Sequence, residues 1–322
     1  MGGTHARFAW QPEPNAAPGA QATVPCGVHA SLAEAARGYL AAQGLPTPAA
    51  AAIGIANPIT GDLVKMTNHH WSFSIRQLRE DLGLAHLAVV NDFQALALGL
   101  TTVPADALLP LGGGEAVAGA PCAVLGPGTG LGVSGLVRGA DGSAIALSGE
   151  GGHVTLAAAD GEEAEVIARL QQRFGHVSAE RALSGPGLVN LYEVVCARQQ
   201  QPAEALTPAD VVARARAGTD AACGRAVGLF CSLLGTVAGN LALTLGAHGG
   251  VYIAGGVAAH LAGELARSRF RERFEQKGRF ASYLSPIPTW LIRDPTLPAL
   301  LGASRALDSQ LRHEASRAAA LA

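Results

Sequence analysis

Short runs of apolar residues alternate with amphipathic stretches along the first third of the chain. An apolar run bounded by turn residues predicts a buried strand, and apolar positions that recur with helical spacing predict a helix. The clearest helix begins with the capping box Ser31-x-x-Glu34 and ends at Gly44. The predicted strands of this third are residues 4–10, 51–56 and 86–90, and the predicted helices are residues 31–43, a helix from Ser74-x-x-Gln77 to Gly83, and residues 93–100.

Loop composition interrupts this pattern twice. Residues 11–27 are rich in Pro and Ala and predict a loop, with a weak strand near Thr23-Val24. Residues 101–119 are rich in Pro and Gly and predict a domain boundary. Beyond it, the predicted strands are residues 121–126, 132–138 and 250–254, and the predicted helices are residues 161–174, 187–198, 208–217, 220–245 and 258–276. Two halves that each open with strands and a glycine turn indicate an α/β protein with two domains and a cleft.

The charge and cysteine content exclude several classes of protein. Lys and Arg number 23 and Asp and Glu number 25, so the 322 residues carry a formal net charge of −2. Binding to a nucleic-acid backbone needs a basic excess, so we expect no nucleic acid as a partner. The five cysteines are odd in number and lack C-x-x-C spacing, which argues against a disulfide framework or a structural zinc site. The N-terminal sequence shows no signal peptide, so we expect a reduced, cytoplasmic chain without a protein metal site.

One stretch, residues 226–245, is apolar enough to suggest a membrane span. It also carries Ser232, Asn240 and several glycines, and it runs directly into a predicted strand. A helix buried inside an α/β protein has the same composition. We therefore expect a core helix and no membrane.

The standard nucleotide and hydrolase motifs are absent from the sequence. There is no G-x-x-x-x-G-K-[ST], no H-R-D or D-F-G, no G-x-S-x-G and no H-E-x-x-H. The glycines from Gly126 to Gly132 are spaced by two, and a strand is predicted to follow them. This spacing does not support a Rossmann fingerprint.

Three glycine turns remain beside predicted strands: Gly2-Gly3-Thr4, Gly128-Thr129-Gly130 and Gly255-Gly256. Glycine allows backbone N–H groups to converge on phosphate oxygens, and a Thr hydroxyl adds a donor. Two such turns, one from each domain, would hold a triphosphate from both sides. A plain hairpin turn is the alternative for each one taken singly.

Asn91-Asp92 lies where a predicted strand ends and a helix begins. Ligand-binding groups of open α/β sheets lie at this position, and a carboxylate there can act as a general base. The alternative is that Asp92 is a helix N-cap, which is the commoner role for Asp at such a place.

A second set of polar residues follows the glycine loop. Glu150-Gly151-Gly152-His153 places an acid and an imidazole on one loop, and Glu180 adds a carboxylate. Such groups suit a ligand with many hydroxyls. The alternatives are a solvated loop for Glu150 and an ion pair with Arg181 or a neighbour for Glu180. His176 is interpreted as structural.

In this order, these segments resemble the bacterial ATP-dependent glucokinase family, within the sugar kinase/Hsp70/actin superfamily. The resemblance covers roughly residues 1–305. It implies a two-domain ribonuclease H-like (actin/hexokinase-type) fold with an interdomain cleft, a small domain of residues 1–102 plus 294–322 and a large domain of residues 103–293. The matching blocks are GGTHARFA from Gly2, ANPITGD from Ala56, MTNHHWSFS from Met66, VVNDF from Val89, LGPGTGLG from Leu125, GEGGHV from Gly149, GHVSAERALSGPGLVNLY from Gly175, GNLAL from Gly239 and GGVYIAGGV from Gly249.

The resemblance implies transfer of the γ-phosphate of ATP to the 6-hydroxyl of glucose, the first step of glycolysis, with Mg²⁺ and in a homodimer. Phosphoryl transfer of this kind depends on positioning and charge stabilisation. The implied roles are Asp92 as catalytic base; Asn91, Glu150, His153 and Glu180 as ligands of the other sugar hydroxyls; Gly2, Gly3 and Thr4 as the first phosphate turn; Gly128, Thr129 and Gly130 as the second; and Gly255 and Gly256 near the adenosine.

The chain departs from the family at its start. Relatives carry a hydrophobic strand followed by Asp-x-Gly-Gly-Thr, and Met1 stands at the x position here. The acid expected near Mg²⁺ and most of the first strand are therefore missing, which we interpret as a late start codon or a truncated chain. His5 stands where the family usually has Asn. The alternatives are a kinase for another hexose and a non-catalytic sugar-binding or regulatory protein.

Overall fold

The structure is a computed structural model in which residues 4–14, 16–66 and 69–321 are described. It consists of two compact units. Unit 1 comprises residues 1–103 and 296–322, and unit 2 comprises residues 104–295. The predicted turn residues Gly2 and Gly3 lie outside the described residues.

Unit 1 opens with an antiparallel hairpin of β1 (His5–Trp10) and β2 (Gly19–Pro25). The prediction of a loop over residues 11–27 is therefore wrong for residues 19–25, and the weak strand predicted near Thr23-Val24 is part of β2. Pairing of Ala6 with Val24, and of Phe8 with Ala22, holds β2 in place although its composition is weakly strand-forming. Cross-strand pairing outweighs local propensity here.

Asn91 ends β6 (His86–Asn91), which pairs in parallel with β3 (Ala50–Ile55), and Asp92 follows it directly. The Ser31 and Ser74 side chains accept the backbone N–H groups of Glu34 and Gln77, so both predicted helix starts are confirmed. The other elements of unit 1 are α1 (Leu32–Gln43), β4 (Leu63–Lys65), β5 (Ser72–Ser74), α2 (Ile75–Asp81), α3 (Asp92–Gly99), α12 (Thr296–Leu321) and the 3-10 helices η1 (Cys26–Val28) and η2 (Leu100–Thr102).

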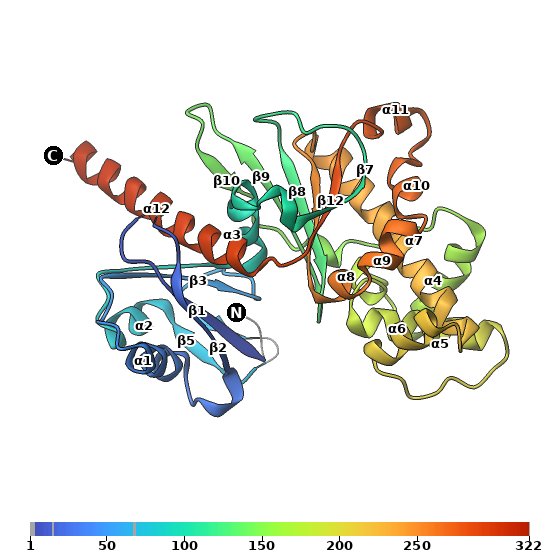
Figure 1. The fold of residues 1–322 in the computed structure, drawn as a ribbon, viewed down its shortest axis with the longest axis horizontal. Coiled ribbons are helices and arrows are strands. Elements are labelled where there is room, and N and C mark those ends of the chain that lie inside the picture. The colour runs from blue at the N-terminus through green and yellow to red at the C-terminus, as the bar shows by residue number, and fades with distance from the viewer. Residues whose placement is uncertain (1–3, 15, 67–68, 322) are drawn as a thin grey trace. The chain divides into compact units, whose positions relative to one another are not determined.

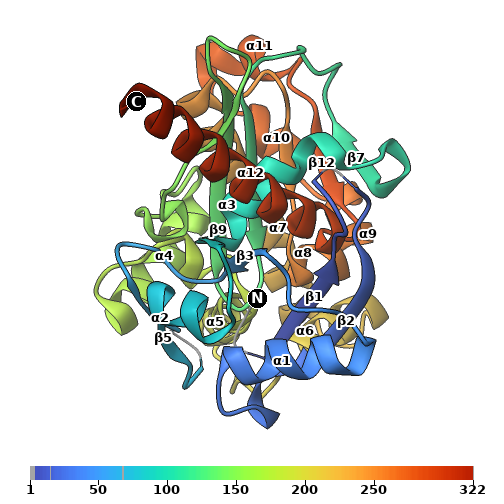
Figure 2. The same cartoon turned by 90° about the vertical axis from the view of Figure 1, so that its left-hand side faces the viewer.

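Helix α12 packs along α3, although the two are some 200 residues apart in sequence (Figures 1 and 2). Gly302 of α12 lies against the Ala95 carbonyl, and Gly99 of α3 lies against the Pro298 carbonyl, with no space for a Cβ at either glycine. Arg305 Nη1 donates to the Leu98 carbonyl at 2.9 Å. The C-terminal helix thereby holds the helix that begins at Asp92.

In the described part of unit 2, six strands form one mixed sheet in the order β10-β9-β8-β11-β12-β7. Strands β8 and β9 form the predicted hairpin, and β11 runs parallel to β8. The predicted boundary over residues 101–119 contains β7, which pairs with β12, so that stretch is only partly loop. The strands are β7 (Leu108–Gly112), β8 (Cys122–Pro127), β9 (Leu131–Arg138), β10 (Ala144–Ala146), β11 (Val251–Ile253) and β12 (Thr289–Ile292).

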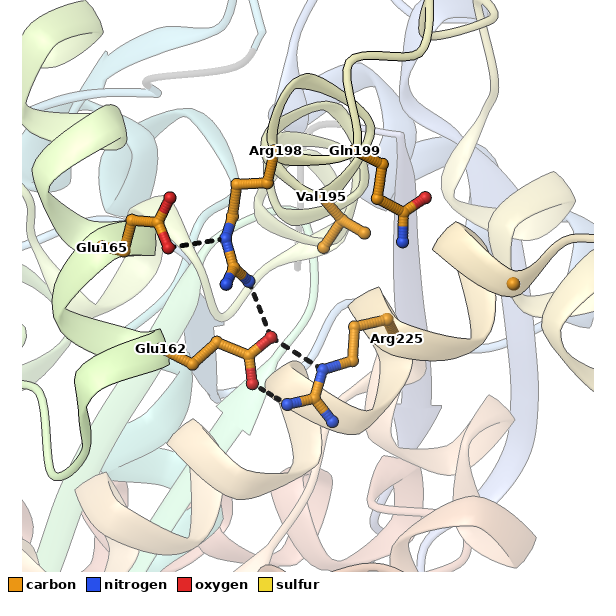
Figure 3. Close-up of a pocket in the computed structure, with 7 residues that line it drawn as sticks. Glu162, Glu165, Val195, Arg198, Gln199 and Arg225 are labelled. Atoms are coloured by element: carbon orange, nitrogen blue, oxygen red, sulfur yellow. Dashed lines mark hydrogen bonds and ion pairs between the residues drawn. The ribbon is translucent and has the colours of Figure 1, made fainter.

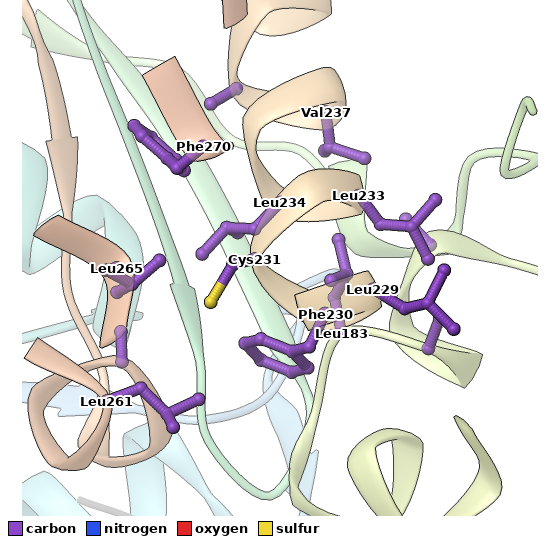
Figure 4. Close-up of a cluster of buried hydrophobic side chains, with 14 of the residues drawn as sticks. Leu183, Leu229, Phe230, Cys231, Leu233, Leu234, Val237, Leu261, Leu265 and Phe270 are labelled. Atoms are coloured by element: carbon purple, nitrogen blue, oxygen red, sulfur yellow. The ribbon is translucent and has the colours of Figure 1, made fainter. Parts of the chain in front are cut away.

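The apolar helix α7 (Ala221–Leu245) is the centre of the unit 2 core (Figure 4). In the described chain it is the one helix long and apolar enough to cross a membrane, and 72% of its most apolar window is buried. Phe230 and Leu234 pack in one cluster with Leu261, Leu265 and Phe270. This helix is a core helix, as its polar and glycine positions predict.

The remaining helices of unit 2 cover this core. The predicted helix over residues 258–276 is three short helices. Ser268 separates the second from the third, because its Oγ donates to the Leu265 carbonyl and accepts the Phe270 N–H. The helices are α4 (Gly161–Phe174), α5 (Gly185–Arg198), α6 (Pro208–Ala217), α8 (Gly256–His260), α9 (Ala262–Arg267), α10 (Phe270–Glu275), α11 (Ala281–Leu284) and the 3-10 helices η3 (Ala105–Ala107), η4 (Gly151–His153), η5 (Ala179–Arg181) and η6 (Gly278–Phe280).

Candidate active site

Asn91 is both the last residue of β6 and the N-cap of α3. Its Oδ1 accepts the N–H groups of Phe93 at 2.8 Å and Gln94 at 3.3 Å. The Gln94 side chain accepts the Asn91 N–H at 3.2 Å, which completes a capping box. The interpretation of Asp92 as the N-cap is therefore wrong, because Asn91 fills that role. Asn91 Nδ2, which lies 3.4 Å from the Asn57 carbonyl, is the part of the side chain that can donate to a ligand.

Asp92 is the first residue of α3 and is half-buried. Burial raises the pKa of its carboxyl above the ordinary 3.8, and the Phe93 N–H, which donates to Oδ1 at 3.0 Å, partly offsets the increase. A carboxyl group whose pKa is raised by its surroundings is better matched to accept a proton near neutral pH. The geometry of Asp92 therefore suits a general base.

In unit 2, two short segments bring Glu150, His153 and Glu180 together. Glu150 precedes η4, and His153 ends it. The chain then pairs with the segment before Glu180: the Leu156 N–H donates to the Val177 carbonyl and the Ala179 N–H to the Val154 carbonyl, both at 2.9 Å. Helix η4, with Glu150 just before it, lies in contact with η5, which carries Glu180. The structure therefore gathers the three predicted sugar ligands of unit 2 although they are up to 30 positions apart.

The environments of these three side chains differ. Glu150 and His153 are exposed, and the Glu150 side chain makes no capping hydrogen bond to η4. Glu180 is partly buried, and its Oε2 accepts the Leu131 N–H at 2.8 Å. Within the described residues Glu180 forms no ion pair, so the alternative of a pair with Arg181 is wrong. His176 Nε2 lies 3.0 Å from Thr155 Oγ1, which agrees with a structural role.

The second glycine turn, Gly128-Thr129-Gly130, joins β8 to β9. The Gly128 N–H donates to the Gly130 carbonyl at 2.8 Å, and Thr129 is exposed. The turn lies beside Gly255, which follows the neighbouring strand β11 and has a φ of +88°. A Cβ on Gly255 would overlap the Pro127 carbonyl, so glycine is required both for the backbone conformation and for the close approach. The second and third predicted glycine turns are therefore adjacent.

The first glycine turn is described only at Thr4. Thr4 is exposed, and its carbonyl accepts the Cys26 N–H at 2.9 Å at the end of the β1–β2 hairpin. This contact fixes the backbone of Thr4, and its side chain remains at the surface. The predicted phosphate role of Thr4 stays a prediction.

The backbone of unit 2 fits the cofactors that the resemblance implies. At Gly128, Gly130, Gly255 and Gly256 the main chain carries no side chain, which lets backbone N–H groups approach phosphate oxygens. In the ranges 4–14, 16–66 and 69–321, no group of three or more His, Cys, Asp and Glu could hold a metal ion. Mg²⁺ at kinase sites is held mainly by phosphates and water, with one or two protein carboxylates, so it would be bound together with ATP.

A pocket of about 550 Å³ lies elsewhere in unit 2, between α4, α5 and α7 (Figure 3). Glu162 bridges Arg198 and Arg225 across it, with Arg198 Nη1 at 2.7 Å and Arg225 Nε at 2.8 Å, and Arg198 Nε also donates to Glu165 at 3.0 Å. These ion pairs satisfy the charges that line the pocket. None of the predicted site residues lines it.

The chain is similar to known proteins over nearly its whole length. A family model described as Glucokinase matches residues 1–310. A glucokinase of Aromatoleum aromaticum is 55% identical over 315 residues, which cover 98% of this chain and 95% of that protein. The crystal structure of a glucokinase from an Antarctic psychrotroph matches with a TM-score of 0.87 and 35% identity, covering 96% of this chain and 97% of that chain. A ROK family glucokinase from Streptomyces griseus, in complex with glucose and AMPPNP, has the same fold, with a TM-score of 0.62, 17% identity, and coverage of 96% and 97%.

The class of protein follows from the fold and these matches. The chain has the two-domain actin/hexokinase-type fold of sugar kinases, and it is an ATP-dependent hexose kinase. The chain belongs to the glucokinase family, and its function is that of a glucokinase. The predicted family, fold class and enzyme class are thereby confirmed.

Sequence reasoning missed two groups of the site. Gln94 completes the capping box with Asn91, and the Asn-x-x-Gln spacing was a visible signal for it. Glu180 accepts the Leu131 N–H, and no sequence signal could have found this donor. Residues of almost every type carry a backbone N–H, and this one lies 49 positions from Glu180.

Proposed function

We propose that Asp92 accepts the proton of the glucose 6-hydroxyl while the γ-phosphate of ATP is transferred to that oxygen. The observation that carries this assignment is the position of Asp92: it is half-buried, it begins α3, and burial raises the pKa of its carboxyl. Asn91 takes the capping role, so the Asp92 carboxylate keeps one oxygen for a substrate hydroxyl. Precise positioning of the base is what phosphoryl transfer to an alcohol requires.

We further propose that the other glucose hydroxyls are bound by Asn91 Nδ2 and by the side chains of Glu150, His153 and Glu180. The contacts between η4 and η5, which gather the last three, support this assignment. Side chains that pair with each hydroxyl discriminate against sugars that lack one, because the partner of the missing hydroxyl would be left unpaired in the complex. On this proposal, units 1 and 2 are the small and large domains of the kinase.

The nucleotide is assigned to the three glycine turns. Gly2, Gly3 and Thr4 form the first phosphate turn, Gly128, Thr129 and Gly130 the second, and Gly255 and Gly256 lie near the adenosine. The adjacency of the last two turns in unit 2 supports this part of the proposal. Mg²⁺ bound with ATP would neutralise charge on the phosphate oxygens. We propose that the protein acts in the cytoplasm, in glycolysis, as a homodimer.

The decisive experiment measures glucose-dependent ADP production by the full chain with Mg-ATP. We expect turnover with glucose and much less with sugars that lack or invert one hydroxyl. The exposed Asp106, changed to Asn, provides a matched control that should retain full activity. Glucose binding without ADP production would contradict the proposal and would instead identify a sugar-binding protein.

A further inference from the structure

The backbone of Leu131 is held on both sides by elements that carry predicted sugar ligands. Its N–H donates to Glu180 Oε2 at 2.8 Å. Its carbonyl lies against Gly152, so closely that a Cβ on Gly152 would overlap it. Leu131 directly follows Gly130, the last residue of the second phosphate turn. One oxygen of Glu180 is therefore bound to the backbone at the end of that turn.

The segment around Glu180 also holds the beginning of the turn. The Gly185 N–H, at the start of α5, donates to the Gly128 carbonyl at 2.8 Å. Ser184 Oγ donates to the Glu180 carbonyl at 2.9 Å and accepts the Gly187 N–H at 3.0 Å, which caps α5. The segment that bears Glu180 thus contacts both ends of the phosphate turn.

The lack of room for a side chain at Gly130 is independent evidence that Glu180 packs against the phosphate turn. A Cβ on Gly130 would collide with Glu180 Oε2, so a larger residue would push the carboxylate away from the turn. At Gly128, the other glycine of this turn, a Cβ would meet nothing within 4 Å. The need for glycine at position 130 therefore comes from the approach of Glu180.

We propose that Glu180 is a positioning residue for the nucleotide as well as a sugar ligand, so that glucose and ATP each raise the affinity for the other. A carboxylate has two oxygens, so Oε2 can keep the Leu131 N–H while Oε1 accepts a sugar hydroxyl. A sugar on Oε1 restricts the side chain and thereby the phosphate turn, which lowers the ordering cost of nucleotide binding. Coupling between two ligands is necessarily reciprocal. This inference rests on the proposed function of the same residues.

The test measures the affinity of the full chain for AMPPNP by calorimetry, with and without glucose. We expect glucose to tighten AMPPNP binding by about fivefold or more. Glu180→Ala should weaken AMPPNP binding without glucose by about tenfold, because the turn loses a charge-assisted hydrogen bond, and should remove the effect of glucose. Glu180→Gln keeps an oxygen that can accept the Leu131 N–H, so it should restore the glucose-free AMPPNP affinity.

Glu150→Ala is the matched control, because Glu150 is a predicted sugar ligand with an exposed side chain that is not bonded to η4. It should weaken glucose binding and leave glucose-free AMPPNP affinity unchanged. A readout independent of ligands is hydrogen exchange of the peptide that contains Leu131, which should be faster in Glu180→Ala than in Glu180→Gln.

The outcomes separate this inference from the proposed function. If the unmodified chain phosphorylates glucose, the proposed function stands. If Glu180→Ala then binds AMPPNP without glucose as tightly as the unmodified chain, or more tightly, only the coupling is overturned. Failure of the unmodified chain to bind AMPPNP rejects the proposed function and the coupling together. If Glu180→Ala does not fold, equal AMPPNP affinity of the unmodified chain with and without glucose still overturns the coupling.

Discussion

The two units hold their candidate residues in different ways. In unit 1, Asn91 and Asp92 are neighbours in sequence, and the hydrogen bonds that fix them come mainly from Phe93 and Gln94. In unit 2, Glu180 is fixed by a backbone group 49 positions away, and the loop with Glu150 and His153 packs on β9. The unit 1 residues therefore depend on the start of one helix, whereas the unit 2 residues depend on long-range packing. Substitutions can test this difference directly.

The largest effect is expected in unit 1, from Asp92→Asn. Loss of the proposed general base should lower kcat by about 100- to 10,000-fold and change glucose affinity far less. Burial raises the pKa of Asp92 above 3.8, and the base acts only when ionised. Activity of the unmodified enzyme should therefore fall as pH decreases through this raised pKa, at a higher pH than an ordinary aspartate would give. The measurement is kcat and kcat/KM across pH.

Asp106→Asn is the control for this substitution, because it removes an exposed aspartate in unit 2. It should leave both kcat and the acid limb of the pH profile unchanged. Full activity of Asp92→Asn would show that the base is another residue. An acid limb that persists unchanged in the residual activity of Asp92→Asn would assign that titration to a different group.

The second effect tests the long-range packing of unit 2, through Gly152→Ala. The new Cβ would meet the Leu131 carbonyl, so η4 must shift on β9. We expect a loss of about 1–3 kcal/mol in the free energy of unfolding, as for overpacked cores. The displacement of Glu150 and His153 should also raise the KM for glucose about tenfold. Denaturant unfolding and steady-state kinetics measure the two effects.

Gly149→Ala is a closely matched control, since a Cβ at Gly149 would meet nothing within 4 Å. It should preserve both the stability and the KM for glucose. If both substitutions raise the KM equally, the loop is sensitive to any loss of glycine, and the contact with Leu131 does not set its position.

The smallest effect is expected from Gln94→Ala, which tests the local hydrogen bonds of unit 1. The substitution removes the side chain that accepts the Asn91 N–H. Helix caps of this kind contribute about 1 kcal/mol, so we expect a decrease in kcat of a few fold with little change in the KM for ATP. Gln77→Ala is the comparison, because Gln77 occupies the same position of α2 but its side chain donates to Asp81. A kcat decrease of the same size in Gln77→Ala would show that the capping box does not position Asp92.

Local sequence signals predicted the regular elements well where the signal and the interaction lie within one helix turn. The helix starts at Ser31 and Ser74 are confirmed because each cap bonds a residue three positions later. Predictions were wrong where a distant partner decides the conformation. Strand β2 extends well beyond the weak strand predicted near Thr23-Val24 because β1 pairs with it. The stretch of residues 101–119 does contain the division between the two units after Val103, but β7 also forms there because β12 pairs with it.

The sequence by itself determined the family, the two-domain fold and the candidate residues, because their types and order form long blocks shared with glucokinases. It also determined that Asn91 and Asp92 stand together, since they are adjacent in the chain. The structure shows that Asn91 is the cap and Asp92 is not, although the Asn-x-x-Gln spacing was a local signal for it. Only the tertiary structure decided that Glu180 holds the end of the Gly128–Gly130 turn. The physical reason is that backbone N–H and C=O groups, identical in every residue, make these contacts, and only the folded chain brings their partners within hydrogen-bonding distance.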